Sequence, residues 1–164
     1  MGFPIPSEEH GFSPLLAHSA DVMETIGARL SGAISAGDTV AISGPLGAGK
    51  SVLCRAIIRA KLRAPDLAVP SPSYTLVNVY DIDGNEIWHV DLYRVSDVEE
   101  LNELGLDDAP TAILLVEWPE RWQALPARKA AIEIAPLADD SRMISLQVNG
   151  DGWEELSRVW SELE

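Results

Sequence analysis

The chain has 164 residues, of which 46% are hydrophobic and 23% charged, a composition typical of a folded soluble domain and unlike that of a disordered chain. Its 12 Lys and Arg residues stand against 26 Asp and Glu residues, which leaves a formal net charge of −14 at pH 7. A protein that grips nucleic acid by itself needs basic surface to replace the phosphate counterions, so we expect no direct nucleic-acid binding.

We treat residues 1–164 as a single domain, since no linker, repeat or low-complexity segment interrupts them. Residues 1–18 begin with a stretch rich in Pro and Gly, and we expect an irregular arm there. Apolar residues at helical spacing from Val22 to Ile34 predict a first helix, with Ser19 or Asp21 as its N-cap.

The next elements are predicted to be a strand, a second helix and a hairpin. The short β-branched run 39–43 predicts a buried strand, and the helix that follows is ended by Pro65. Two strand-like runs, 75–82 and 86–93, are joined through Asp-Gly-Asn at 83–85, which is a strong hairpin signal.

Two further elements lie between residues 96 and 116. Residues 96–104 resemble a short helix, with Ser96 as N-cap and Glu99 completing a capping box. The continuous apolar run 113–116 predicts a central strand that is covered on both faces.

The C-terminal part predicts two alternating strands and a helix. The runs 132–134 and 144–148 alternate apolar and polar residues, which predicts antiparallel pairing with one solvated face. A final helix carries Trp153, Leu156, Val159 or Trp160, and Leu163 on one side. We therefore expect an α/β fold whose mixed sheet is parallel at its centre, antiparallel toward an edge and flanked by helices.

Residues 44–51 read Gly-Pro-Leu-Gly-Ala-Gly-Lys-Ser, a complete phosphate-binding loop placed between a predicted strand and a predicted helix. Such loops point backbone N–H groups at phosphate oxygens, and the following helix adds the positive end of its dipole. Lys50 is expected to reach the β- and γ-phosphates and Ser51 to ligate Mg²⁺. The sequence thus predicts a P-loop NTPase that uses ATP and Mg²⁺, with these nucleotide-binding residues: Gly44, Gly47, Ala48, Gly49, Lys50, Ser51 and Val52.

A phosphate loop also needs a carboxylate that holds the metal or orients the attacking water. Glu117 directly follows the strand 113–116, at the end that faces the nucleotide crevice in such sheets, and is the first candidate. Asp91 is a second candidate, although its spacing also suits an exposed strand residue. His89 alone suggests a structural role. The polar segment 71–75 suits either a nucleotide-sensing loop or an ordinary turn.

The chain is expected in the cytoplasm. No apolar run approaches the roughly 20 residues of a membrane-spanning helix. Residues 1–6 lack the basic start and the apolar stretch of a secretory signal. The single cysteine, Cys54, excludes an internal disulfide framework and fits a reducing compartment, where we expect a packed, inert thiol.

Four motifs in their order along the chain resemble the TsaE family, also called YjeE, the ATPase of bacterial tRNA threonylcarbamoyladenosine (t6A) biosynthesis. The resemblance runs from about residue 19 to about residue 148. The motifs are Leu-Gly-Ala-Gly-Lys-Ser at 46–51, Ser-Pro-Ser-Tyr-Thr-Leu-Val at 71–77, His-Val-Asp-Leu-Tyr-Arg at 89–94, and Val-Glu-Trp-Pro at 116–119.

The resemblance implies a Mg²⁺-dependent ATPase that supports the complex forming N6-threonylcarbamoyladenosine at position 37 of tRNAs reading ANN codons. The implied partners are a TsaB-like and a TsaD-like protein, related to sugar kinase-like and glycoprotease-like proteins, and they carry out the transfer. A regulatory ATP-binding module with incidental hydrolysis is one alternative. A small-molecule kinase is another, although no Arg-rich lid segment is evident.

The same resemblance assigns residue roles. Lys50, Asp91 and Glu117 are implied to be catalytic, and Ser51 and Glu117 to hold the metal. Trp118 is implied to be the aromatic residue beside the nucleotide. The switch-like loop comprises Ser71, Pro72, Ser73, Tyr74 and Thr75.

This sequence departs from the family pattern at three positions. Ser51 replaces the commoner Thr and keeps its hydroxyl, Pro45 stands where an acid is frequent, and Ser73 stands where Thr is frequent. None of these changes removes a catalytic group. Arg94 is the basic residue outside the loop that we consider as an arginine finger, and a partner is the other possible source of one.

Overall fold

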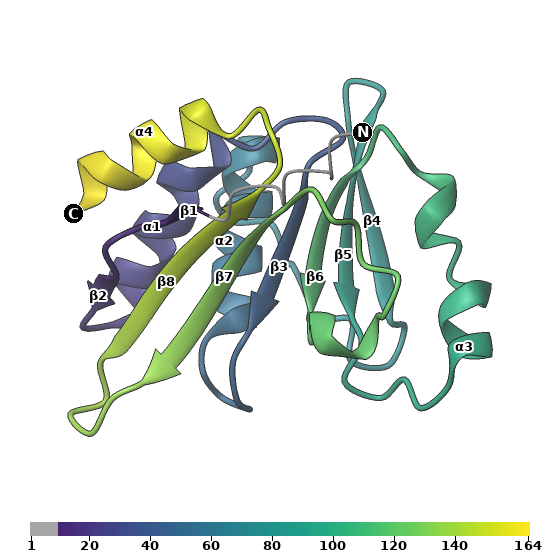
Figure 1. Cartoon of the computed structure of the whole chain (residues 1–164), viewed down its shortest axis with the longest axis horizontal. Coiled ribbons are helices and arrows are strands. Elements are labelled where there is room, and N and C mark those ends of the chain that lie inside the picture. The colour runs from purple at the N-terminus through teal and green to yellow at the C-terminus, as the bar shows by residue number, and fades with distance from the viewer. Residues whose placement is uncertain (1–9) are drawn as a thin grey trace, which may run out of the picture.

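The computed structural model describes residues 10–164, which form one eight-stranded mixed sheet and the helices packed on it (Figure 1). No helix in this part of the chain is long and apolar enough to cross a membrane. In chain order the elements are β1 (His10–Gly11), β2 (Leu15–Ala17), α1 (Ala20–Ser31), β3 (Thr39–Ser43), α2 (Lys50–Leu62), β4 (Val77–Ile82), β5 (Asn85–Asp91), α3 (Val98–Glu103), the 3-10 helix η1 (Leu106–Asp108), β6 (Ile113–Glu117), the 3-10 helix η2 (Pro119–Arg121), β7 (Lys129–Pro136), β8 (Arg142–Asn149) and α4 (Glu154–Leu163).

The strands lie in the order β1-β8-β7-β3-β6-β5-β4, and β2 also pairs with β8. Neighbours among β7, β3, β6 and β5 are parallel, whereas β4 pairs with β5, and β8 with β7, in antiparallel fashion. The predicted mixed sheet with a parallel centre is therefore confirmed. Antiparallel pairing occurs toward both edges rather than toward one, because short connections link β4 to β5 and β7 to β8.

Two apolar clusters cover the two faces of the sheet. The larger one joins α1, α2 and α4 to the strands, and Figure 1 shows these three helices gathered on one side. The smaller one includes Leu101 of α3 and Trp122. All five residues of β6 are buried, with Ile113 and Leu115 in the larger cluster and Leu114 in the smaller. The prediction of a central strand covered on both faces is confirmed.

The prediction of an irregular arm over 1–18 is wrong for its described part. Residues 10–11 and 15–17 form β1 and β2, which pair with β8, and the carbonyl oxygen of Ser13 accepts a hydrogen bond from Trp160 Nε1 at 2.9 Å. Local composition could not reveal this, because the pairing partner lies far along the chain. Residues 1–9 lie outside the described residues.

The ends of two helices differ from those predicted. Ser19 does cap α1, since its Oγ accepts a hydrogen bond from the Val22 N–H, but the helix ends at Ser31. Val22 is exposed, so Met23 takes its place on the inner face. Asp97, not Ser96, caps α3.

The cap of α3 is a variant of the capping box, with Asp97 as N-cap and Glu100 bonded to the residue before it. Asp97 Oδ1 accepts from the Glu100 N–H at 2.9 Å, and Glu100 reaches back to the Ser96 N–H at 3.2 Å. The β4–β5 turn is also tighter than predicted. Asp83 and Gly84 both have positive φ, at 48° and 88°, as a two-residue type I′ turn requires, and Asn85 already belongs to β5.

Candidate functional site

The phosphate loop, residues 44–51, leaves the carboxyl end of β3 and runs into the first turn of α2. Gly44 has φ 150°, and a Cβ added there would lie 2.6 Å from the carbonyl oxygen of Ile134 on β7. Only glycine allows the loop to pass so close to the neighbouring strand. The loop is therefore shaped by the sheet beside it as well as by its own sequence.

The Lys50 side chain is folded back into the loop. It is 5% exposed, and its Nζ donates to the carbonyl oxygens of Gly44 and Pro45, each at 2.7 Å. Nζ also lies 4.4 Å from the centre of the Trp118 ring, a cation–π distance. Burial lowers the pKa of Lys50, while the negative charges of Glu117 and Asp91 act in the opposite direction.

Ser51 and Glu117 are in direct contact at the base of the loop. The Ser51 hydroxyl lies 3.0 Å from Glu117 Oε1 and 3.3 Å from Oε2. The second oxygen is also 2.7 Å from His89 Nε2, and both Glu117 and His89 are almost completely buried. In the described part of the chain, His89 Nδ1 has no hydrogen-bond partner.

Strand register explains why these side chains meet. On the parallel pair β5–β6, His89 lies opposite Leu115 and Asp91 lies opposite Glu117. Alternate residues of a strand share one face, so His89, Asp91 and Glu117 all project toward α2. The two carboxylates therefore lie side by side at the carboxyl end of the parallel sheet, where ligands bind in open α/β folds.

Asp91 is held by neighbouring groups at the rim of the loop. Its Oδ1 accepts from the Tyr93 N–H at 3.0 Å, and its Oδ2 lies 3.5 Å from the Ser71 hydroxyl. Burial raises the pKa of Asp91, and the negative charge of Glu117 raises it further, against the effect of the Tyr93 hydrogen bond. The carboxyl group is thus a better proton acceptor than an ordinary aspartate.

The predicted switch-like loop turns two of its five residues toward the site. Ser71 Oγ lies 3.4 Å from Ser51 Oγ and 3.0 Å from Ser73 Oγ. Pro72 accepts the Leu76 N–H through its carbonyl, Thr75 donates its hydroxyl to Asn78, and Tyr74 is 81% exposed. The structure therefore brings Ser71 and Ser73 to the phosphate loop, and Pro72, Tyr74 and Thr75 lie beyond it.

A cleft of about 330 Å³ opens over the phosphate loop. Its volume falls at the small end of the range for ligand pockets. Gly44 does not line this cleft, but its carbonyl oxygen accepts a hydrogen bond from Lys50 and so helps to position that side chain. The lining residues are Leu46, Gly47, Ala48, Gly49, Lys50, Ser51, Val52, Ser71, Ser73, Asp91, Tyr93, Glu117 and Trp118.

Sequence reasoning did not place Tyr93 and Arg142 at this site, and it named His89 only as a structural residue. Tyr93 stacks on Trp118 with ring centres 4.8 Å apart, and His89 contacts Glu117. Their position in the 89–94 motif was the available signal. Arg142 of β8 donates to the carbonyl oxygens of Ala48 at 3.0 Å and Gly47 at 3.4 Å, and nothing in the local sequence indicates this contact.

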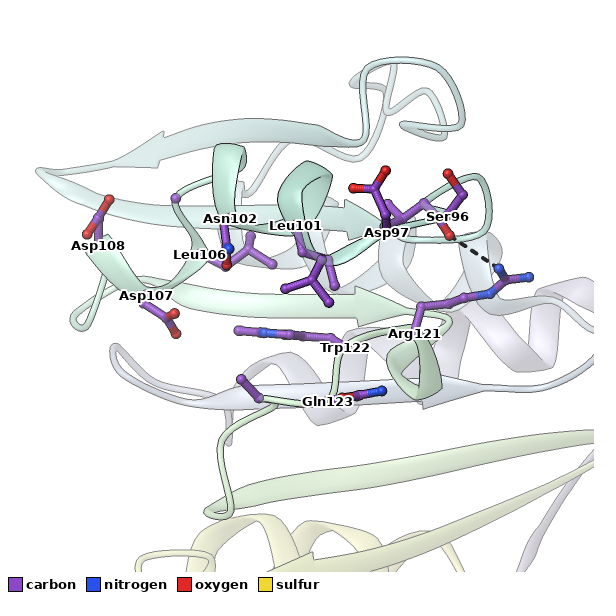
Figure 2. A pocket seen from close by; sticks show the side chains of 14 residues that line it. Ser96, Asp97, Leu101, Asn102, Leu106, Asp107, Asp108, Arg121, Trp122 and Gln123 are labelled. Atoms are coloured by element: carbon purple, nitrogen blue, oxygen red, sulfur yellow. Dashed lines mark hydrogen bonds between the residues drawn. The ribbon is translucent and has the colours of Figure 1, made fainter.

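Arg94, considered as an arginine finger, lies elsewhere. Its guanidinium stacks on the Tyr74 ring, 4.2 Å from the ring centre, and does not line the cleft. A separate cavity of about 420 Å³, shown in Figure 2, contains none of the predicted site residues. Leu101 and Trp122 lie in its wall, and Arg121 donates to the Val95 carbonyl at 3.2 Å.

Comparison with known proteins places this site in a family. A protein from Haemophilus influenzae is 38% identical over 109 residues, which cover 65% of this chain and 68% of that protein. The corresponding protein of Rickettsia felis is 30% identical, with 82% of this chain and 80% of that protein covered. Both carry the name tRNA threonylcarbamoyladenosine biosynthesis protein TsaE.

The fold is shared with a solved structure as well. The crystal structure of YdiB from Bacillus subtilis superposes with a TM-score of 0.72 at 20% identity and covers 94% of this chain and 95% of that chain. The family model described as "Threonylcarbamoyl adenosine biosynthesis protein TsaE" matches residues 17–144, a span that contains every candidate site residue. This chain therefore belongs to the TsaE family, whose role is in t6A biosynthesis.

Proposed function

We propose that this protein is a Mg²⁺-dependent ATPase of the cytoplasm that supports the complex forming N6-threonylcarbamoyladenosine at position 37 of tRNAs reading ANN codons. The observation that carries the proposal is the contact of Ser51 with Glu117 at the base of a phosphate loop, 3.0 Å between hydroxyl and carboxylate. Membership of the TsaE family supports the biological setting.

The residues of the loop fit the triphosphate of ATP. The N-terminus of α2 begins at Lys50, so its first N–H groups and its dipole face the cleft. The Lys50 ammonium is already directed into the loop by two carbonyl oxygens, and there it would balance phosphate charge. Trp118 and Tyr93 form an aromatic wall on the other side of Lys50.

The residues at the base of the loop fit Mg²⁺. The Ser51 hydroxyl and the Glu117 carboxylate are oxygen donors at the start of a helix and the end of a strand, and oxygen is the ligand type that Mg²⁺ prefers. When bound, Mg²⁺ would neutralise charge that develops on the phosphates. Glu117 or Asp91 would then orient the attacking water, and the raised pKa of Asp91 suits it to accept the proton.

The tRNA would be reached through partners rather than directly. The net charge of −14 disfavours contact with a polyanion, and the transfer chemistry would belong to TsaB-like and TsaD-like proteins. ATP hydrolysis here would drive or reset that partner complex.

The test is a Lys50→Ala variant, assayed for ATP turnover in the purified protein and for t6A in the tRNA of cells that carry it as their sole copy. We expect both to fall sharply, because the substitution removes the charge that the loop positions. Thermal unfolding of the variant would check that it folds, and Lys61→Ala, outside the loop, is the matched control. Unchanged turnover together with unchanged t6A would overturn the proposal.

A further inference from the structure

Three potential metal ligands of different chemistry meet behind the phosphate loop. The Cys54 sulfur, a ring nitrogen of His89 and a carboxylate oxygen of Glu117 all lie within 4.8 Å of one another. Their exposed fractions are 0%, 1% and 2%, respectively. Cys54 lies one helical turn beyond Lys50 on α2, whereas His89 and Glu117 come from β5 and β6, so the tertiary fold creates the cluster.

We propose that Cys54, His89 and Glu117 form a second metal site, selective for Zn²⁺, that competes with the Mg²⁺ role of Glu117. Thiolate, imidazole and carboxylate are the three ligand types that Zn²⁺ takes from proteins, and three such ligands leave a fourth position open. Mg²⁺ prefers oxygen ligands alone and would not take sulfur or nitrogen.

The charges of the cluster balance a divalent cation. One thiolate and one carboxylate together carry two negative charges, and neutral imidazole adds none, so the ion would be buried without net charge. Binding would release the Cys54 proton to solvent. Burial raises the pKa of the Cys54 thiol, which in the absence of Zn²⁺ keeps the sulfur protonated.

To bind the ion through Nε2, His89 must carry its ring proton on Nδ1 and give up the Nε2–H hydrogen bond to Glu117. Its Nε2 is 2.7 Å from Glu117, but its Nδ1 has no partner within residues 10–164. With the proton on Nδ1, the Nε2 lone pair would face the ion, and the bonds of the ion to Nε2 and to Glu117 would replace the hydrogen bond between them. Bonds of about 2.3 Å to sulfur and about 2.0–2.2 Å to nitrogen and oxygen imply ligand atoms about 3.3–3.6 Å apart. Side-chain rotations would bring the cluster to these spacings, with the His89 Nε2 and Glu117 atoms moving slightly apart from 2.7 Å and the Cys54 sulfur moving closer.

Occupation of this site would have a consequence for the nucleotide site, and this part of the inference rests on the proposed function. Glu117 contacts Ser51 through the same carboxylate that faces His89. A Zn²⁺ ion held by Cys54 and His89 would draw the carboxylate away from Ser51. Zn²⁺ would therefore inhibit ATP turnover without entering the nucleotide cleft.

The first test measures metal binding by the full nucleotide-free chain, with Co²⁺ as a spectroscopic probe and Zn²⁺ as the competitor. We expect one Co²⁺ per chain with a thiolate-to-cobalt absorption band, displaced by Zn²⁺. Cys54→Ala and Cys54→Ser should both lose the band and bind at least about tenfold more weakly. His18→Gln, at an exposed histidine outside the cluster, is the matched control and should bind as the wild type does. Co²⁺ binding without the thiolate band would overturn the proposed site.

The second test measures ATP turnover at saturating Mg²⁺ as Zn²⁺ is added. We expect inhibition of the wild type and at least about tenfold lower Zn²⁺ sensitivity in Cys54→Ser, with similar turnover in the absence of Zn²⁺. Equal sensitivity of the two proteins would overturn the inhibitory role. If the chain binds Co²⁺ through Cys54 but hydrolyses no ATP, the proposed function fails while the metal site stands.

Discussion

Asp91 and Glu117 lie directly opposite each other on the neighbouring parallel strands β5 and β6. Two acids are thereby held at one end of the sheet, both almost excluded from solvent. Burial raises the pKa of Asp91, and the charge of Glu117 adds to this. The folded protein therefore holds Asp91 in a setting where its charged form is unfavourable. This makes Asp91 a stronger base and lowers the free energy of unfolding at neutral pH.

Asp91→Asn should therefore be more stable than the wild type at neutral pH and much less active. A folded-state pKa above the unfolded value means that native Asp91 binds more protons than unfolded Asp91 between those two values. Wild-type stability relative to Asp91→Asn should fall as pH rises from about 4 through the folded-state pKa, and then level off. Urea unfolding of both proteins across this range measures the difference.

Turnover of Asp91→Asn should fall on the order of 10²-fold, since the amide cannot accept a proton. Asp66→Asn, at an exposed position, is the matched control and should leave both stability and turnover nearly unchanged. A less stable Asp91→Asn at neutral pH would contradict the argument.

Ser51→Ala should lower ATP turnover on the order of 10²-fold and raise the Mg²⁺ concentration needed for half-maximal turnover, because it removes an oxygen donor beside Glu117. Ser51→Thr is the matched control. It keeps the hydroxyl and adds only a methyl group, so its Mg²⁺ dependence should stay close to that of the wild type. A Mg²⁺ titration of steady-state turnover distinguishes the three proteins. Equal Mg²⁺ dependence of Ser51→Ala would exclude the serine as a ligand.

Gly44→Ala should lower the free energy of unfolding more than Gly47→Ala does, although both glycines belong to the phosphate loop. A Cβ at residue 44 would meet the Ile134 carbonyl oxygen at 2.6 Å, whereas nothing lies within 4 Å of one at residue 47. We expect a loss of unfolding free energy of about 3 kcal/mol for Gly44→Ala, from clash plus backbone strain, and about 1 kcal/mol for Gly47→Ala, from strain alone. Urea unfolding curves measure both values, and equal losses would show that β7 does not constrain the loop.

Arg142→Ala should loosen the phosphate loop from β8. The guanidinium donates to the Ala48 and Gly47 carbonyls, and charged hydrogen bonds of this kind contribute about 1.5–3 kcal/mol, less at a half-exposed site. We expect a stability loss of about 1 kcal/mol and weaker ATP binding in calorimetry. Arg29→Ala, which breaks an exposed ion pair with Glu162, should cost less than about 1 kcal/mol and leave ATP affinity unchanged. If the two variants behave alike, Arg142 does not support the loop.

The parts of the site that could be predicted from sequence are those whose chemistry is local. The phosphate loop is one continuous motif, and its flanking strand and helix follow from their apolar patterns. Glu117 could be placed at the loop because the carboxyl ends of parallel strands meet at one edge of the sheet. Its contact with Ser51 follows from that rule.

The parts that could not be predicted depend on register and on distant segments. His89 faces Glu117 only because β5 pairs with β6 in one particular register, and the sequence pattern does not specify that register. The contact of Arg142 with Ala48 joins positions that lie 94 residues apart in the sequence. β1 and β2 likewise need β8 as a partner, so the Pro- and Gly-rich composition near the start of the chain wrongly predicts an irregular arm there.

The position of β3 in the sheet has a consequence for the order of events during translation. Thr39 on β3 pairs with Leu114, and Val40 pairs with Ala130, so both neighbours of this strand emerge from the ribosome long after it does. Contacts between such distant segments slow folding. The phosphate loop is among the early segments to be synthesised, yet it can take its shape only when nearly the whole chain is available. A nascent chain would therefore be unable to bind nucleotide until β7 had joined the sheet.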